Sequence, residues 1–190
     1  MFKQETFTKN EIRDIIIATV ALTLIFSFPN FSAIHIVFIS VVVGFILHEL
    51  AHKFAATKFN AVAFFKLWPE GILIGLVTMF LPFRFLAPGA VVIYPYKYGR
   101  WGYREKHLTS NEMGIIASVG PIVNIFFAFF FVLIPGWQLV GQINSPLALF
   151  NMIPIKPLDG SKVLLWKWWI WAFLFGMSIF SILLFLKLPA

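Results

Sequence analysis

Long apolar windows follow one another along most of the chain, and short polar stretches separate them. These windows are Ile15–Phe28, Ala33–Ala56, Gly71–Phe83, Gly114–Pro135, Pro146–Trp166 and Trp168–Leu186, and at least four of them are long enough to cross a bilayer core of about 30 Å. Only 12% of the 190 residues are charged, whereas soluble domains carry roughly 25%. A soluble globular protein is therefore nearly excluded. The 24 Phe and 7 Trp residues also exclude a disordered chain.

The windows predict an all-α polytopic membrane protein with about five to six transmembrane or re-entrant segments and a small interfacial β element. The β element is expected within Ala87–Tyr96, where a Pro-Gly turn precedes a β-branched run. The first window lacks a small-x-small cleavage site and is interpreted as a retained helix. No repeat or interdomain linker is visible, so residues 1–190 are expected to form a single membrane-embedded domain.

The distribution of basic residues predicts the orientation of the chain. Lys3, Lys9 and Arg13 precede the first window, whereas the loop at Pro29–Ser32 that follows it carries no charge. Because cytoplasmic loops are enriched in Lys and Arg, the N-terminus is expected to be cytoplasmic. The uncharged loop Gly136–Ser145 is expected on the opposite side.

The window Gly71–Phe83 is too short to be a simple span and has basic residues on both sides. Before it come Lys53, Lys58 and Lys66, and after it come Lys97, Arg100, Arg104 and Lys106. Both flanks are therefore expected on the cytoplasmic side. We predict that this segment dips into the membrane without crossing it.

Charge and cysteine content limit the partners and cofactors. The net charge is +7, but the basic residues stand singly between apolar runs and form no cluster that could follow phosphates. The lipid bilayer is therefore the expected partner, and nucleic acid is not. With no cysteine in the chain, any metal must be held by His, Asp, Glu or Asn. The sequence does not predict an oligomeric state.

An acidic side chain and two imidazoles end the second window. After the uncharged stretch Ala33–Leu47 the chain reads His48-Glu49-Leu50-Ala51-His52. Ionisable groups inside a bilayer helix are costly and need a partner or a metal. Residues four apart share one helix face, so two imidazoles can bind one metal while Glu49 points toward a water molecule beside it. This is the HExxH arrangement of zinc hydrolases.

A structural interpretation of the same residues is a polar cluster at the cytoplasmic end of the helix, with Glu49 paired to Lys53. The other two histidines are not expected to bind the metal. His35 lies thirteen residues before His48, on another part of the helix surface, and His107 lies in a charged loop.

Zinc in catalytic sites commonly has three protein ligands, so a third is needed. Asp159, in the segment Asn151–Gly160, is the only acid in the last seventy-eight residues. If both segments are helical from Ala33 and from Pro146, His48 and Asp159 lie at similar depths of about 20 Å. The structural alternative is that Asp159 caps a helix that starts at Gly160.

The two motifs together resemble the site-2 protease family of intramembrane zinc metalloproteases. A third family-like element is Gly120-Pro121-Ile-Val-Asn124, and the three occur in the family's order. The resemblance implies one Zn²⁺ per chain held by His48, His52 and Asp159. It also implies that Glu49 acts as the general base.

The resemblance further implies a multi-pass protein that cleaves transmembrane protein substrates, with its active site toward the cytoplasmic side. At this length the chain is expected to be a short form without PDZ or CBS domains. The strand at Ala90–Tyr94 is either an acceptor for an extended substrate or an ordinary interfacial hairpin. Asn124 and Asn151 either hold substrate or form hydrogen bonds between helices.

Two other functions remain compatible with the residues. One is a membrane zinc protease that uses HExxH with a downstream Glu and acts on soluble or membrane-anchored substrates. The downstream acids are Glu105, Glu112 and Asp159, and only Asp159 is expected at a matching depth. The other is a membrane protein that binds zinc without catalysis. Glu49 argues against the latter, because a purely structural site needs no carboxylate between its ligands.

Overall fold

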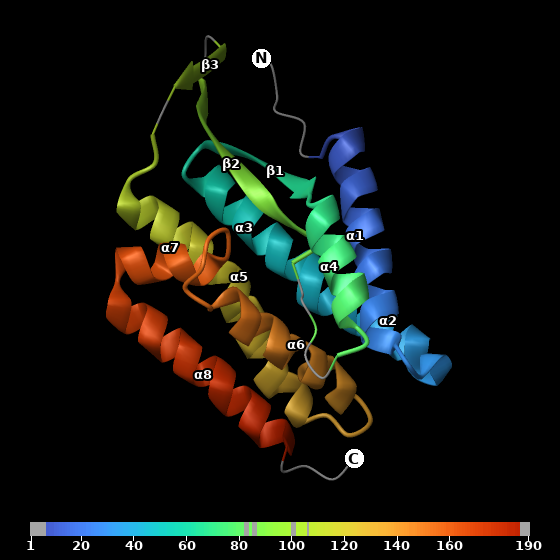
Figure 1. Ribbon diagram of the computed structural model, residues 1–190. Helices are drawn as coiled ribbons and strands as arrows, with labels where there is room; N and C mark the ends of the chain where they lie inside the picture. Colours follow the sequence, from blue (N-terminus) through green and yellow to red (C-terminus); the bar gives the residue numbers. More distant parts are fainter. Residues whose placement is uncertain (1–6, 82–83, 85–86, 100–101, 106, 187–190) are drawn as a thin grey trace.

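The computed structural model describes residues 7–81, 84, 87–99, 102–105 and 107–186. Lys3, Arg100 and Lys106, used above to orient the chain, lie outside the described residues. The helices are α1 (Lys9–Ser27), α2 (Ile34–Val41), α3 (Leu47–Lys58), α4 (Pro69–Thr78), α5 (Ser110–Val132), α6 (Gln138–Asn151), α7 (Asp159–Trp166) and α8 (Trp168–Leu186) (Figure 1). The strands are β1 (Ala61–Leu67), β2 (Gly89–Gly99) and β3 (Gly102–Glu105).

A mostly helical membrane protein with a small β element is therefore confirmed. Within the described ranges, three helical stretches are long and apolar enough to cross a membrane: Phe31–Lys58, Ser110–Val132 and Trp168–Leu186. The first joins a 3-10 turn (Phe31–Ala33), α2, a π-helix at Val42–Ile46 and α3. The other predicted windows correspond to α1, whose first turns are charged, and to the shorter helices α4, α6 and α7.

The small sheet is antiparallel in the order β1-β2-β3, and β2 contains the predicted strand. Strand β1 is not predicted from the sequence, where it is a short apolar segment between the basic residues Lys58 and Lys66. The structure ends α3 at Lys58 and turns the chain at Asn60, which has a φ of 55°. The following residues, Ala61–Leu67, then pair with β2 and bury most of their side chains.

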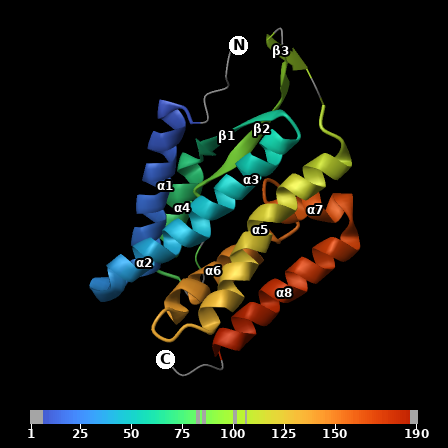
Figure 2. The ribbon, with the colours of Figure 1, turned by 180° about the vertical axis from the view of Figure 1, so that it is seen from behind.

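The segment that carries α4 leaves the sheet and returns to it. Leu67 lies opposite Gly89, and the Trp68 N–H donates to the Pro88 carbonyl at 2.8 Å. Between these points, α4 runs beside α1 (Figures 1 and 2). Phe80 then packs edge-on against Phe28, just beyond the end of α1, with ring centroids 4.8 Å apart. The segment therefore begins and ends at the same end of the sheet, and its re-entry into a membrane stays a prediction.

Two helices replace the single returning span expected from Pro146 to Trp166. Helix α6 begins at Gln138, inside the predicted loop, and Pro146 lies within it. The chain then leaves helical structure between Asn151 and Asp159, where two prolines interrupt it. The depth argument for Asp159 was therefore wrong in its assumption of one continuous helix. Asp159 is also the first residue of α7, and the residue before it, Leu158, occupies the cap position.

Apolar clusters fix the helices around α3. One cluster joins α1, α2 and α6 through buried side chains such as Leu22, Val41 and Leu147. Another joins α5, the end of α6, α7 and α8, for example through Met152 and Val163. A third cluster, which includes Ala56 of α3 and Ile116 of α5, holds α3 against α5, and α7 packs on the same helix α5 (Figure 2).

Candidate metal centre

The His-Glu-His motif lies at the start of α3, directly after the π-helix at Val42–Ile46. A π-helix interrupts the regular hydrogen-bond pattern of an α-helix and is often found at functional sites. Here the Gly44 carbonyl accepts a hydrogen bond from Asn124 Nδ2 at 2.9 Å. The irregular turn thus ties the start of α3 to α5.

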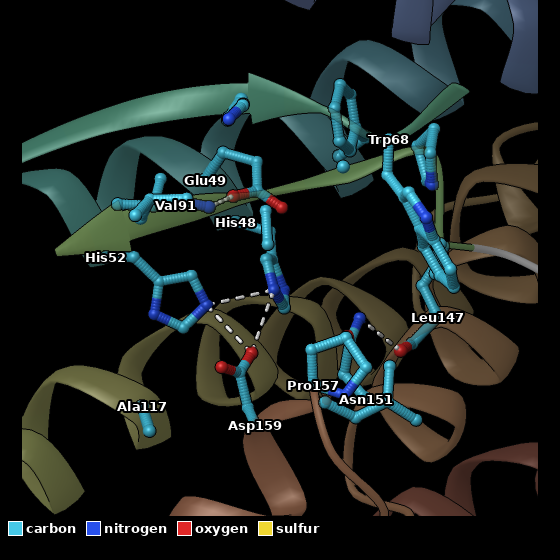
Figure 3. Close-up of a pocket in the computed structure, with 18 of the residues that line it drawn as sticks. His48, Glu49, His52, Trp68, Val91, Ala117, Leu147, Asn151, Pro157 and Asp159 are labelled. Carbon is cyan, nitrogen blue, oxygen red and sulfur yellow. Dashed lines mark hydrogen bonds and ion pairs between the residues drawn. The ribbon is translucent and has the colours of Figure 1, made fainter. Parts of the chain in front are cut away.

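Three potential ligand atoms converge at this point (Figure 3). His48 Nε2 lies 3.0 Å from His52 Nε2, and Asp159 Oδ2 lies 3.4 Å and 2.9 Å from these two nitrogens respectively. Ligands 2.0–2.1 Å from a tetrahedral zinc ion lie roughly 3.3 Å from one another. All three residues are buried. Their chemistry and their spacing therefore fit one zinc ion.

Asn124 determines which nitrogen of the His48 ring carries the proton. Its amide nitrogen donates to Gly44 O and to Asn144 Oδ1, so its oxygen faces His48 Nδ1, 2.5 Å away. An amide oxygen can only accept, so Nδ1 carries the proton. The Nε2 lone pair of His48 is then directed toward the other two ligand atoms.

His52 is held in the same way by a backbone group. Its Nδ1 lies 2.7 Å from the Ile116 carbonyl of α5, which can only accept a hydrogen bond. The Nε2 atoms of His48 and His52 therefore present two lone pairs to each other beside a carboxylate oxygen. This arrangement is favourable only with a cation or a proton between them.

Gly120 on α5 leaves room for the two imidazoles. A Cβ at this position would lie 2.3 Å from His52 Nε2 and 2.7 Å from His48 Nε2, well inside contact distance. Any other residue would push the rings apart or occupy the space between them. The Gly120-to-Asn124 element thus supplies clearance at one end and a hydrogen-bond partner at the other.

Glu49 lies beside the three ligand atoms but is not one of them. Its Oε2 accepts a hydrogen bond from the Val91 amide of β2 at 3.1 Å. Glu49 is not paired with Lys53 as the structural interpretation required. Lys53 instead forms a buried ion pair with Glu11 of α1. Glu49 is thus a buried carboxylate that faces the cavity, as a general base at this site would be.

Asp159 approaches the histidines because the chain turns tightly before α7. A Cβ on Gly160 would lie 2.2 Å from the Met152 carbonyl oxygen, so only glycine allows this close approach. The second carboxylate oxygen, Oδ1, accepts a hydrogen bond from Lys162 Nζ at 3.1 Å. Lys162 therefore orients Asp159 with one oxygen toward the histidines.

A cavity of about 270 Å³ opens onto the site. It is lined by the motif residues of α3, by Ala90–Ile93 of β2, and by Asn151 and Pro157. Asn151 Nδ2 donates to the Leu147 carbonyl of its own helix at 3.1 Å, so it makes no hydrogen bond between helices through that nitrogen. Both asparagines line the cavity, but only Asn124 forms a hydrogen bond with a potential metal ligand.

The remaining histidines lie away from the site. His35 and His107 are exposed, and neither belongs to the single group of potential metal ligands found among the described residues. Sequence reasoning did not identify Val91, Lys162 and the Ile116 carbonyl. Only Lys162 had a local signal, because it lies one helical turn after Asp159.

Comparison with known proteins identifies the family to which this chain belongs. No family model and no solved structure matches the chain. A protein of Methanocaldococcus jannaschii named "Putative zinc metalloprotease MJ0611" is 40% identical over 194 aligned residues, which cover 95% of this chain and 96% of that protein. A Bacillus subtilis protein, YwhC, whose name gives the same activity, is 29% identical over 66% of each chain. Since the first similarity extends over nearly the whole of both chains, this chain belongs to a family of zinc metalloproteases.

Proposed function

We propose that the protein is an intramembrane zinc endopeptidase that cleaves peptide bonds of transmembrane substrates. The observation that carries this proposal is the position of the His48–His52 motif within a 28-residue helical run, Phe31–Lys58, which contains an apolar window with a mean hydropathy of 2.2. The motif residues are also buried. A protease that acted only at the membrane surface would not need its ionisable groups in such a helix.

The chain supplies the groups that hydrolysis requires. A zinc ion held by His48, His52 and Asp159 would lower the pKa of water and polarise the scissile carbonyl. Glu49 then takes the proton from water and passes it to the leaving amine. Lys162 and Asn124 keep two of the ligands in their orientation.

Strand β2 offers a place for an unwound substrate. A peptide bond in a helix is hydrogen-bonded and shielded, so it must be locally unwound before water can attack. Within the described ranges, β3 pairs only with Tyr96–Gly99, so the first part of β2 has a sheet neighbour on one side only. That part, Ala90–Ile93, lines the cavity beside Glu49. An extended substrate segment can add to this edge.

The proposed orientation has a cytoplasmic N-terminus and an active site that faces the cytoplasmic side. Lys9 and Arg13 at the start of α1 support this orientation, because the loop after α1 carries no charge. The expected partners are transmembrane protein substrates and the lipid bilayer, and no nucleic acid.

The test compares purified wild type with Glu49→Gln on a panel of single-span membrane substrates, with zinc content measured for both. We expect the wild type to cleave at sites inside the spans and Glu49→Gln to retain zinc while losing activity by several orders of magnitude. An active Glu49→Gln variant would remove Glu49 from the mechanism. If only soluble peptides are cut, a membrane-anchored protease for soluble substrates becomes the better assignment.

A further inference from the structure

Two acidic residues of α1 cover the outer edge of β1. Glu11 Oε1 accepts the Phe65 N–H at 2.9 Å, and Asp14 Oδ2 accepts the Leu67 N–H at 3.3 Å. Both amides point away from β2. The edge of β1 that faces α1 is therefore occupied by carboxylates rather than by another strand.

The residue that Glu11 binds lies directly opposite the residue that binds Glu49. Phe65 and Val91 are partners in the β1–β2 register. The Phe65 N–H points outward to Glu11, and the Val91 N–H points outward to Glu49. This is the geometry of a non-hydrogen-bonded antiparallel pair, in which both amides face away from the neighbouring strand. The two-stranded ribbon is thus held between two glutamates.

Glu11 also binds the helix that carries Glu49. Both of its carboxylate oxygens accept hydrogen bonds from Lys53 Nζ at 2.5 Å. Lys53 lies one helical turn after Glu49 on the same face of α3. The Lys53 ammonium group also lies 4.2 Å from the centroid of the Phe7 ring. Glu11 and Lys53 are almost fully buried, with 2% and 4% exposure.

These contacts link α3 to itself through the sheet. Lys53 of α3 binds Glu11, Glu11 binds β1, β1 pairs with β2, and β2 binds Glu49 of α3. We propose that Glu11 is a positioning residue for the general base: its carboxylate sets the separation between α3 and β2 and thereby the orientation of Glu49 toward the cavity. The proposal rests on the proposed function, which makes Glu49 the base. Asp14 binds the same strand edge but touches neither Lys53 nor the residue opposite Val91, and it provides the matched control.

The simpler interpretation is that Glu11 and Lys53 form an ion pair with a purely structural role. Removing one partner alone leaves a buried charge without compensation and can prevent folding. Replacing both charges by groups of similar volume avoids this problem. Glu11→Gln/Lys53→Met keeps an oxygen that can accept the Phe65 N–H, whereas Glu11→Leu/Lys53→Met does not. The two double variants thus differ in the hydrogen bond to β1 and in the buried amide nitrogen of the glutamine.

We expect kcat of Glu11→Leu/Lys53→Met to be about tenfold lower than that of Glu11→Gln/Lys53→Met, with equal zinc content and equal KM. Asp14→Leu should keep kcat close to wild type. Equal kcat values in the two double variants would overturn the proposal. So would an Asp14→Leu variant that loses as much activity, because the effect would then be a general weakening of the sheet.

Hydrogen–deuterium exchange of the segment that contains Val91 gives a readout without substrate. We expect faster exchange in Glu11→Leu/Lys53→Met than in Glu11→Gln/Lys53→Met and in Asp14→Leu. If the wild type cleaves no substrate, the proposed function fails, but this measurement still decides whether Glu11 holds the strand against Glu49. Identical exchange in the two double variants would refute the positioning role independently of catalysis.

Discussion

His48 Nε2 and His52 Nε2 lie 3.0 Å apart, and each ring has its Nδ1 atom engaged by a group on α5. Because Nδ1 carries the proton in both rings, two lone pairs face each other across this short distance. The repulsion between these two lone pairs is unfavourable, and a bound cation removes it. Metal binding and the stability of this helix pair are therefore linked.

Zinc removal should lower the stability of the protein. Binding to the folded state alone contributes about 2.7 kcal/mol when free zinc is 100 times the Kd. We expect the melting temperature in detergent to fall on chelation and to recover on adding zinc. His48→Ala, His52→Ala and Asp159→Ala should each abolish this recovery and lose zinc. His35→Ala is the matched control and should behave as wild type, whereas full zinc occupancy in all three ligand variants would contradict the assignment.

Gly120→Ala should weaken zinc binding although it replaces no ligand residue. The added Cβ would lie 2.3 Å from His52 Nε2, so the rings must move. We expect zinc affinity to fall by more than about tenfold, as it does when ligand orientation is lost. Gly176→Ala on α8 is the control, because a Cβ there meets nothing within 4 Å. Alanine usually stabilises a helix relative to glycine, so this control should bind zinc normally. A zinc-replete Gly120→Ala protein would show that the site is less crowded than the geometry requires.

The local parts of this site could be predicted from the sequence. The spacing of His48, Glu49 and His52 determines their relation on any helix, whatever the surroundings. The histidines therefore needed no tertiary information. Asp159 was found from its chemistry and from the resemblance to a known family, since the estimate of its depth assumed a helix that the chain does not form.

Contacts between distant segments could not be predicted in the same way. The local rule pairs Lys53 with Glu49, four residues away, but the fold brings Glu11 of α1 to Lys53 instead. Strand β1 was missed for a related reason. It is a short apolar stretch between Lys58 and Lys66, and its pairing with the distant strand β2 is what makes it a strand. In both cases the decisive partner lies far away in the sequence.

Substitution of the two asparagines should separate their roles. Asn124→Leu removes the partner of His48 Nδ1, and we expect zinc affinity to fall about 10- to 100-fold. Asn124→Asp should retain more affinity, because a carboxylate oxygen still accepts the His48 Nδ1 proton. Asn151→Leu should keep zinc affinity, since its amide nitrogen bonds only within its own helix, and should change KM if it contacts substrate. Loss of zinc in Asn151→Leu would instead assign both residues to the support of the metal.

Cysteine labelling should report the orientation of the chain, which has no native cysteine. We expect Glu70→Cys and Ser110→Cys to react with an impermeant maleimide only from the cytoplasmic side, because the segment between β1 and β2 returns to its starting point. Ser32→Cys and Pro135→Cys should react only from the opposite side. Labelling of positions 70 and 110 from different sides would mean that the chain crosses between them and would overturn the re-entrant interpretation.

Cleavage should depend on how easily the substrate helix unwinds. The proposed site lies within the apolar run Phe31–Lys58, and a helical amide presents no free group to the open edge of β2. Gly or Pro near the scissile bond weakens a helix by roughly 1 and 3 kcal/mol respectively, relative to Ala. We therefore expect cleavage of a single-span substrate to speed up when either is placed in its cytoplasmic half, and to slow when both are replaced by Leu. Membrane insertion of each substrate must be matched, because Pro also weakens a span. If cleavage rates do not depend on the helix propensity of the substrate, and soluble surface peptides are cleaved at the same rate, a membrane-anchored protease for soluble substrates becomes the better assignment.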